Sequence, residues 1–333
     1  MRTKTKYFIL YFLISAAAPL FLLTLLKIFL FSRPELSYDI YYFVIGLQLI
    51  SGFFINYWYA QKIAIRQWLK ITLAIFNIIG FFYLMGYNMT LISYSEIVKQ
   101  SWNLYKKGWK KIWVYLLMLL VPTLALSALS TISLYLSVYI PSSTMASEII
   151  ILFVFAASLV FAVWTSIALV RALKEIFIGQ EPKEWKTNFS ESSGLIMPII
   201  YTSILVFLII LGGTILLIIP GIIFSVWYAF TFYTVIFEDK RGFKSLSASK
   251  SLTVGRWWAI VWRLIAPGLI FGILGALLSF VVIGLVDLIP MDPLGYAIAE
   301  RIMSAVVNVA ITPLSAAAIL ILYLSAKNNP SGQ

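Results

Sequence analysis

The chain has 333 residues, of which 62% are apolar or aromatic and only 11% are charged. An ordinary soluble domain has about 25% charged residues and needs a polar outer face, so this composition excludes a soluble globular protein. The apolar runs lack the alternation of β-barrel strands. The sequence therefore predicts an all-α, polytopic transmembrane helical bundle. Cations flank the apolar runs, so the net charge of +12 is expected to favour anionic lipid headgroups on the cytoplasmic side, not nucleic acid.

The chain contains neither cysteine nor histidine. It therefore lacks the commonest catalytic base and metal ligand, the thiolate nucleophile and cysteine metal sites. We expect no enzymatic activity, no catalytic residue, no bound metal and no cofactor.

Three apolar runs open the chain, at residues 7–31, 40–60 and 71–93. Each is long enough to cross a bilayer core, which takes about 20 helical residues. Residues 1–93 are therefore expected to form an N-terminal segment of three transmembrane helices. The first run also has signal-peptide features, with three cations before it and three alanines within it. Because the apolar residues continue past those alanines, we expect a retained span.

An amphipathic helix is predicted over residues 95–113. Trp102, Tyr105 and Trp109 recur at helical steps and form an aromatic stripe, while Lys106 and Lys110 lie mostly away from it. Trp and Tyr favour the headgroup level, so we expect this helix to lie in the membrane interface. A solvated helix packed on the bundle is the alternative.

Six further spans are predicted, at residues 112–138, 149–170, 195–219, 222–237, 257–286 and 302–326. Residues 192–237 carry no charge. As one helix they would be about 69 Å long, over twice the hydrocarbon core, so they must fold back, and Pro220-Gly221 is the expected turn. Residues 94–326 therefore form a six-span module of three helical hairpins with interfacial helices, and residues 327–333 form a polar tail.

Most cations of the six-span module lie on one side of the predicted spans. The positive-inside rule makes that side cytoplasmic. Nine spans then place the N-terminal cations outside, against the rule, whereas eight spans with one early re-entrant or in-plane segment would place them inside. Both arrangements remain open, and both describe a multi-pass protein of the cytoplasmic membrane.

Three sequence features occur in a characteristic order. Residues 216–223 surround the Pro-Gly pair, residues 235–238 end in Glu238, and Ser245 and Ser249 lead to Trp257-Trp258. This pattern resembles the helical membrane domain fused in some bacteria to glycerophosphoryl diester phosphodiesterases, and its uncharacterised stand-alone relatives. The resemblance covers roughly residues 95–326. It implies a membrane module near glycerolipid metabolism, but not catalysis, because the phosphodiesterase domain is a separate soluble barrel that uses histidine.

Two polar stripes run along predicted spans. The fourth span carries Thr123, Ser127, Ser130 and Ser133, and the ninth carries Glu300, Ser304, Asn308 and Thr312. Such stripes line a hydrophilic path or allow tight helix packing. Because an unpaired asparagine amide is costly in hydrocarbon, we expect the ninth-span stripe to face the bundle interior.

Two arginines complete the candidate residues. Arg263 lies just inside the eighth span and is expected to snorkel to the interface or to bind lipid phosphate. Arg301 is expected to pair with Asp287 or Glu148. The sequence thus favours a non-enzymatic membrane protein that acts through lipid or membrane-partner contacts. A small-molecule or lipid transporter that uses the two stripes is the alternative.

Overall fold

The computed structural model describes residues 50–58, 60–61, 91–139, 145–216 and 218–329, with the side chains of residues 130–139, 145–148 and 293–294 excepted. Two compact units divide the chain. One comprises Met1–Met89 with Gly255–Trp262, and the other comprises Thr90–Val254 with Arg263–Gln333. In the first unit residues 50–58 are helical. The rest of the predicted three-helix N-terminal segment lies outside the described residues.

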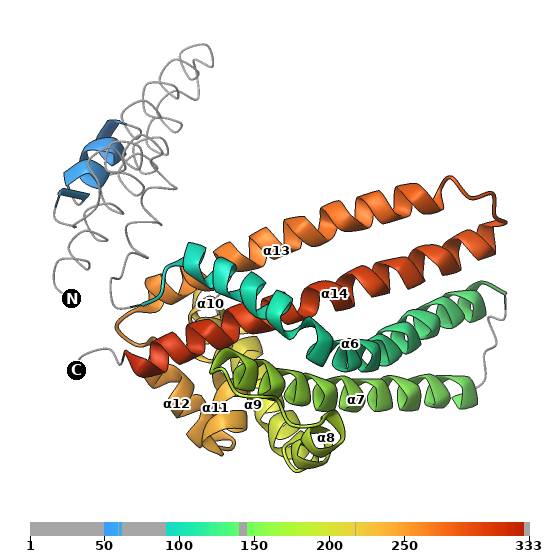
Figure 1. Cartoon of the computed structure of the whole chain (residues 1–333), viewed down its shortest axis with the longest axis horizontal. Helices are drawn as coiled ribbons and strands as arrows, with labels where there is room; N and C mark the ends of the chain where they lie inside the picture. The colour runs from blue at the N-terminus through green and yellow to red at the C-terminus, as the bar shows by residue number, and fades with distance from the viewer. Residues whose placement is uncertain (1–49, 59, 62–90, 140–144, 217, 330–333) are drawn as a thin grey trace, which may run out of the picture. The chain divides into compact units, whose positions relative to one another are not determined.

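The described part of the second unit is helical, and all its labelled elements are α-helices (Figure 1). The helices are α6 (Tyr94–Tyr139), α7 (Met145–Phe177), α8 (Trp185–Ser193), α9 (Ile196–Leu216), α10 (Ile218–Trp227), α11 (Thr231–Glu238), α12 (Phe243–Thr253), α13 (Trp257–Val286, with its first six residues in the other unit) and α14 (Pro293–Asn328). Six stretches of the described residues are long and apolar enough to cross a membrane. The predicted all-α, multi-span architecture of residues 94–326 is confirmed.

Helix α6 is longer than predicted. It runs without interruption from Tyr94 to Tyr139, so the amphipathic stretch and the fourth span are one helix and not two. The sequence offers no strong break between them, because the glycine at position 108 is buried in a packing contact. A Cβ there would lie 3.0 Å from Cδ1 of Ile176 in α7. The helix changes direction along its length (Figure 1) and contains Pro122, a residue type that kinks helices.

The tightest packing in the second unit joins α6 with α7 and with α14. The buried face of α6 includes Ile97, Leu104, Ile112 and Tyr115, at the steps of seven, eight and three expected for one helical face. Residues at the C-terminal end of α14, such as Tyr323, are also fully buried. This core fixes the register between α6 and α14, and with it the place where their polar residues meet.

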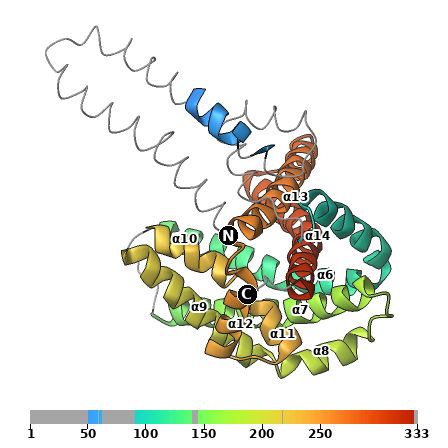
Figure 2. The ribbon, with the colours of Figure 1, turned by 90° about the vertical axis from the view of Figure 1, so that its left-hand side faces the viewer.

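The turn between α9 and α10 differs from the prediction. Helix α9 ends at Leu216 and α10 begins at Ile218, so the chain reverses before Pro220-Gly221. Proline fits the first turn of α10 because its missing N–H would be unpaired there anyway. Gly221 serves close packing, since a Cβ would lie 2.1 Å from Oγ1 of Thr214 in α9. Figure 2 shows the two helices side by side.

The predicted seventh span is broken into α10 and α11. At the break, the Ser249 hydroxyl of α12 accepts a hydrogen bond from the Phe230 N–H (3.1 Å) and donates one to the Trp227 carbonyl (2.7 Å). One turn earlier in α12, the Ser245 hydroxyl donates to the Thr231 carbonyl of α11 (3.0 Å). The serines of α12 therefore pair backbone groups that the interrupted helix cannot pair itself.

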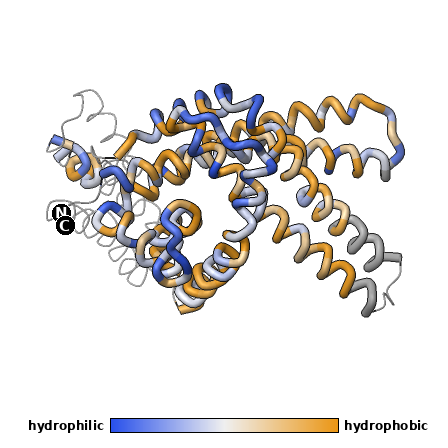
Figure 3. Tube along the Cα trace, turned by 60° about the horizontal axis from the view of Figure 1, so that its bottom comes forward, coloured by the Kyte–Doolittle hydropathy of each residue, from blue (hydrophilic) through white to orange (hydrophobic). Residues whose placement is uncertain are grey.

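Helices α13 and α14 form the last hairpin, joined by a loop that contains Asp287 and Asp292 and is partly hydrophilic in Figure 3. Helix α14 begins at Pro293, nine residues earlier than the predicted ninth span. Proline is favourable at a helix start, which explains the earlier beginning. As a result, Glu300 and Arg301 lie inside a helix and not in the preceding loop.

Candidate functional site

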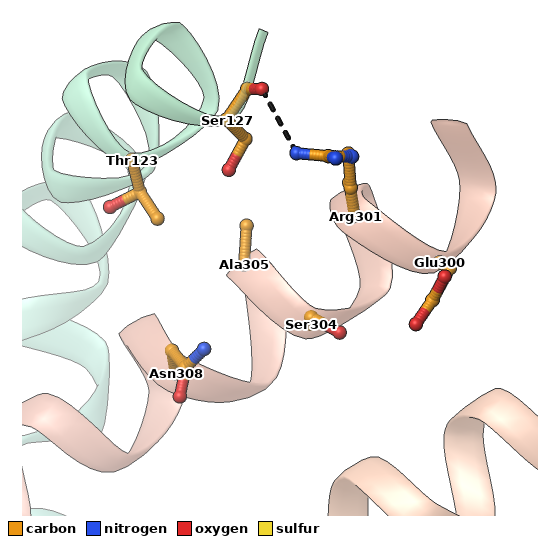
Figure 4. A pocket seen from close by; sticks show the side chains of 7 residues that line it. All are labelled: Thr123, Ser127, Glu300, Arg301, Ser304, Ala305 and Asn308. Atoms are coloured by element: carbon orange, nitrogen blue, oxygen red, sulfur yellow. Dashed lines mark hydrogen bonds between the residues drawn. The ribbon is translucent and has the colours of Figure 1, made fainter. Parts of the chain in front are cut away.

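The two polar stripes meet in one cavity of about 220 Å³ between α6 and α14, called here the polar cavity (Figure 4). It is lined by Thr123, Ser127, Glu300, Arg301, Ser304, Ala305 and Asn308. Steps of three or four residues place each set on one helical face, and the packing of α6 against α14 brings the faces together. The sequence predicted five of these seven residues as candidates for a polar path. Arg301 was singled out for an ion pair, and Ala305 was not singled out.

Hydrogen bonds within the polar cavity orient several of its groups. The Thr123 hydroxyl donates to the Leu119 carbonyl one turn back (2.7 Å), which leaves its oxygen able to accept. Arg301 Nη1 donates to the Ser127 backbone carbonyl (3.3 Å), so the guanidinium bridges α14 to α6. Glu300 points away from Arg301 (Figure 4) and forms no ion pair with any residue that the structure describes.

Asn308 borders a second and larger space of about 690 Å³, called here the apolar groove. Its walls come from α7, α11, α13 and α14. Most of its lining is apolar, and glycines such as Gly272 and Gly275 leave room on the α13 side. Thr312 also lines the groove, with its hydroxyl donating to the Asn308 carbonyl (2.9 Å). A polar compartment and an apolar one thus adjoin at a single asparagine.

The α14 stripe was predicted to face the bundle interior and not lipid, and that orientation stays a prediction, but the stripe is not packed shut. Asn308 is exposed, and Ser304 and Thr312 are only partly buried. The stripe instead lines two accessible cavities. The physical reason is the spacing of the helices, since small residues on α13 and α14 do not fill the space between them. Tight packing therefore does not account for the α14 stripe.

Other candidate residues lie elsewhere. The side chains of Ser130 and Ser133 fall outside the described residues. Arg263 does not line the polar cavity. It is 7% exposed, and its Nε donates to the carbonyl of Ile92 (2.5 Å) just before α6. Backbone carbonyls thus bind the guanidinium within the protein, and the expected snorkelling or lipid-phosphate contact stays a prediction.

The expected ion pair between Arg301 and Asp287 is also wrong. Ion pairs between described residues do not include it, and Asp287 lies at the Tyr296 hydroxyl instead. The other predicted partner, Glu148, has its side chain outside the described residues.

The aromatic stripe of α6 is exposed on the second unit. Trp102 is 42% exposed and Trp109 49%, while the helix packs on its neighbours through a different face. Tyr105 is half-buried and stacks with Trp102 at 6.3 Å between ring centroids. Lys106 and Lys110 are exposed, and the Lys106 ammonium lies 5.6 Å from the Trp102 ring centroid. The helix is therefore both packed on the bundle and free to present aromatic and cationic side chains.

Sequence reasoning missed a charged cluster at the C-terminal end of α14, the end opposite to the polar cavity. The Glu238 carboxylate accepts a hydrogen bond from the Tyr323 hydroxyl (2.7 Å) and lies 2.8 Å from Lys240 Nζ and 3.1 Å from Lys327 Nζ. Tyr323 and Lys327 come from α14, so the cluster fastens α11 to α14. Tyr323 and Lys327 lie more than 80 residues from Glu238 along the chain, and no local pattern could have joined them to it.

A second missed contact holds α8 in place. The Asn188 side chain is fully buried, and its amide donates to the Tyr115 hydroxyl (2.9 Å) and to the Ala168 carbonyl (2.8 Å). Beside it, Glu191 pairs with Lys183 (2.6 Å) and with Arg171. The Lys183 ammonium, assisted by Arg171, lowers the pKa of the Glu191 carboxyl below its usual value. Both contacts are structural, and neither touches the polar cavity.

No known protein family, curated protein or solved structure matches this chain significantly. A functional conclusion therefore rests on the chain's own residues, and above all on the adjoining polar cavity and apolar groove.

Proposed function

We propose that this chain is a non-enzymatic, multi-pass protein of the cytoplasmic membrane that acts by binding membrane lipid. The observation that carries the proposal is the adjacency of the polar cavity and the apolar groove at Asn308. A lipid has the same two-part character, with a polar headgroup and an apolar chain. The polar cavity suits the headgroup, and the apolar groove suits the chain.

The depth of the two spaces agrees with this assignment. At 1.5 Å per residue, Glu300 lies about 10 Å along α14 from its first residue, Pro293, and Asn308 lies about 22 Å along it. If α14 crosses the membrane as proposed, the charged lining is nearer the membrane surface and the groove begins deeper. A lipid bound with its headgroup at Arg301 would extend its chain along α14 in the direction that lipid chains take in a bilayer.

Binding at this site is tested with Asn308→Leu, which removes the polar residue shared by both spaces. The protein is purified in mild detergent, and the phospholipid retained per chain is measured by mass spectrometry. Wild type is expected to retain lipid, and the variant is expected to retain about tenfold less, as for the loss of one or two buried hydrogen bonds. The matched control is Val306→Leu, an exposed position of the same helix outside both linings. Equal retention by the two variants would contradict the proposal.

A second lipid contact is proposed for the exposed face of α6. Trp102 and Trp109 would lie at the headgroup level, with Lys106 and Lys110 against anionic headgroups on the cytoplasmic side. Since the chain has no cysteine, Lys106→Cys gives a single labelling site. Labelling by a membrane-impermeant thiol reagent is expected only from the cytoplasmic side, and labelling only from outside would overturn this orientation.

Transport is the second candidate function, because Asn308 belongs to both spaces and the polar positions continue into the groove at Thr312 and Ser315. The relevant assay places the protein in vesicles that contain a fluorescent lipid and adds a membrane-impermeant quencher. Faster loss of the inner-leaflet signal than in protein-free vesicles would support lipid movement. Loss at the protein-free rate would reject transport and leave binding in place. A role near glycerolipid metabolism, as the family resemblance implies, is compatible with either outcome.

A further inference from the structure

We infer that the polar cavity binds a lipid headgroup that carries hydroxyl groups on adjacent carbon atoms, as glycerol and sugar headgroups do. This inference rests on the proposed lipid binding and adds the class of headgroup. It starts from three polar side chains of the cavity lining, Glu300, Ser304 and Asn308 (Figure 4). They follow one another at steps of four residues, so they form one ridge along α14, called here the α14 ridge.

The side chains of the α14 ridge have hydrogen-bonding capacity that the folded chain does not use. They form no hydrogen bond or ion pair with any residue that the structure describes. By contrast, the Thr312 hydroxyl of the same helix donates to the Asn308 backbone carbonyl (2.9 Å). Asn308 is exposed, Glu300 and Ser304 are only partly buried, and the cavity is accessible, so water can hydrate the ridge until a ligand replaces it.

The chemistry of the α14 ridge matches hydroxyl groups. The Glu300 carboxylate accepts hydrogen bonds, whereas the Ser304 hydroxyl and the Asn308 amide both donate and accept. A ligand hydroxyl also donates and accepts, so it can pair with each of the three. A phosphate oxygen finds no donor at Glu300, and a choline ammonium has no N–H to donate. This recognition does not depend on Arg301, whose guanidinium donates to the Ser127 carbonyl (3.3 Å).

The length of the α14 ridge favours several hydroxyls over a single ammonium. Glu300 and Asn308 are eight residues apart, which is about 12 Å along the helix axis. A primary ammonium concentrates its N–H donors on one nitrogen atom, so it contacts one part of the ridge. Glycerol or a sugar carries hydroxyls on successive carbon atoms, so it can contact neighbouring side chains. The cavity of about 220 Å³ has the volume of roughly seven liquid water molecules, which admits a headgroup of glycerol size.

The experiment compares two phospholipids that differ only in headgroup hydroxyls. One has a glycerol headgroup, and the other has a propanol headgroup, which keeps the phosphate, its charge and the carbon chain but lacks both hydroxyls. The full chain is exchanged into micelles that contain equal amounts of the two lipids with identical acyl chains, and retained lipid is counted by native mass spectrometry. Wild type is expected to retain the glycerol lipid about tenfold over the propanol lipid, as for two hydrogen bonds. Equal retention would overturn the headgroup assignment and leave lipid binding intact.

Two variants assign the preference to the α14 ridge. Ser304→Ala removes a donor and an acceptor, and Glu300→Gln weakens an acceptor while keeping its shape. Each is expected to lower the preference about threefold, as for one hydrogen bond, while total lipid retention changes less. Ser251→Ala is the matched control for the serine variant, because Ser251 is exposed on α12 and lines neither space, so it should keep the full preference. A full preference in both ridge variants, shown to be folded by melting, would overturn the inference.

Further lipids in the same micelles identify the source of the hydroxyls. A diacylglycerol that carries one sugar is expected to be retained above the propanol phospholipid, because the recognition does not require the phosphate. Its retention at the level of the propanol lipid would confine the site to glycerol headgroups. An ethanolamine phospholipid retained above the glycerol phospholipid would overturn the choice of hydroxyls over an ammonium. Retention of no lipid by wild type would overturn both this inference and the proposed lipid binding.

Discussion

Ser249→Ala tests whether α12 stabilises the break between α10 and α11. The Ser249 hydroxyl pairs two backbone groups, the Phe230 N–H and the Trp227 carbonyl. Phe230 is fully buried, so its N–H has no access to water. Leaving a buried polar group unpaired costs about 1–3 kcal/mol. Alanine regains about 0.5 kcal/mol of helix propensity relative to serine, so the expected net loss of unfolding free energy is about 0.5–2.5 kcal/mol.

The matched control for this change lies two residues away on α12. Ser251 is exposed, and its hydroxyl bonds only the Ala248 carbonyl of its own helix, so Ser251→Ala should leave stability unchanged or slightly raised. Both variants are melted in detergent micelles with tryptophan fluorescence as the signal. The midpoint of Ser249→Ala is expected to fall by about 5 °C relative to Ser251→Ala. Equal midpoints would refute the role given to Ser249.

Two further predictions concern helix packing and pH. Gly213→Ala should destabilise the α9–α10 hairpin, because the new Cβ would lie 2.7 Å from the Phe224 ring. Gly212→Ala is the control, since a Cβ there meets nothing within 4 Å. Equal thermal midpoints for the two variants would contradict the close approach of the Phe224 ring to Gly213. The Glu191 carboxyl has a lowered pKa because it binds the Lys183 ammonium. The stability that this ion pair adds to the folded protein is therefore fully present above the unfolded-state pKa of about 4.3. It is lost as pH falls through the folded-state pKa. Wild type should therefore be more stable than Glu191→Gln at pH 7 and lose that advantage in acid, and a stability difference that does not depend on pH would count against the ion pair.

The sequence alone determined the secondary structure class and the polar stripes. Long apolar runs in a chain with 11% charge leave the backbone no partner in lipid except itself, so helices follow from composition. Stripes such as Thr123 with Ser127, or Ser304 with Asn308, follow from the helical period, which is a local property. Both were therefore readable before any tertiary contact was known.

The exact element boundaries depended on local contacts that periodicity does not report. The glycine at position 108 did not break α6 because it packs on Ile176, and Pro220 lies in the first turn of α10 and did not form the turn between the helices. In each case the residue type allows two conformations, and packing against a neighbouring helix selects one.

The tertiary structure decided how the polar residues are used. The hydropathy period of α14 places Asn308 on one face, but only the spacing of the surrounding helices shows that this face lines an accessible polar cavity and an apolar groove. Likewise, Arg263 is an intramembrane cation in sequence, and only the fold supplies the Ile92 carbonyl 171 residues away. Contacts between distant segments depend on how whole helices pack, because one sequence period is compatible with many neighbours.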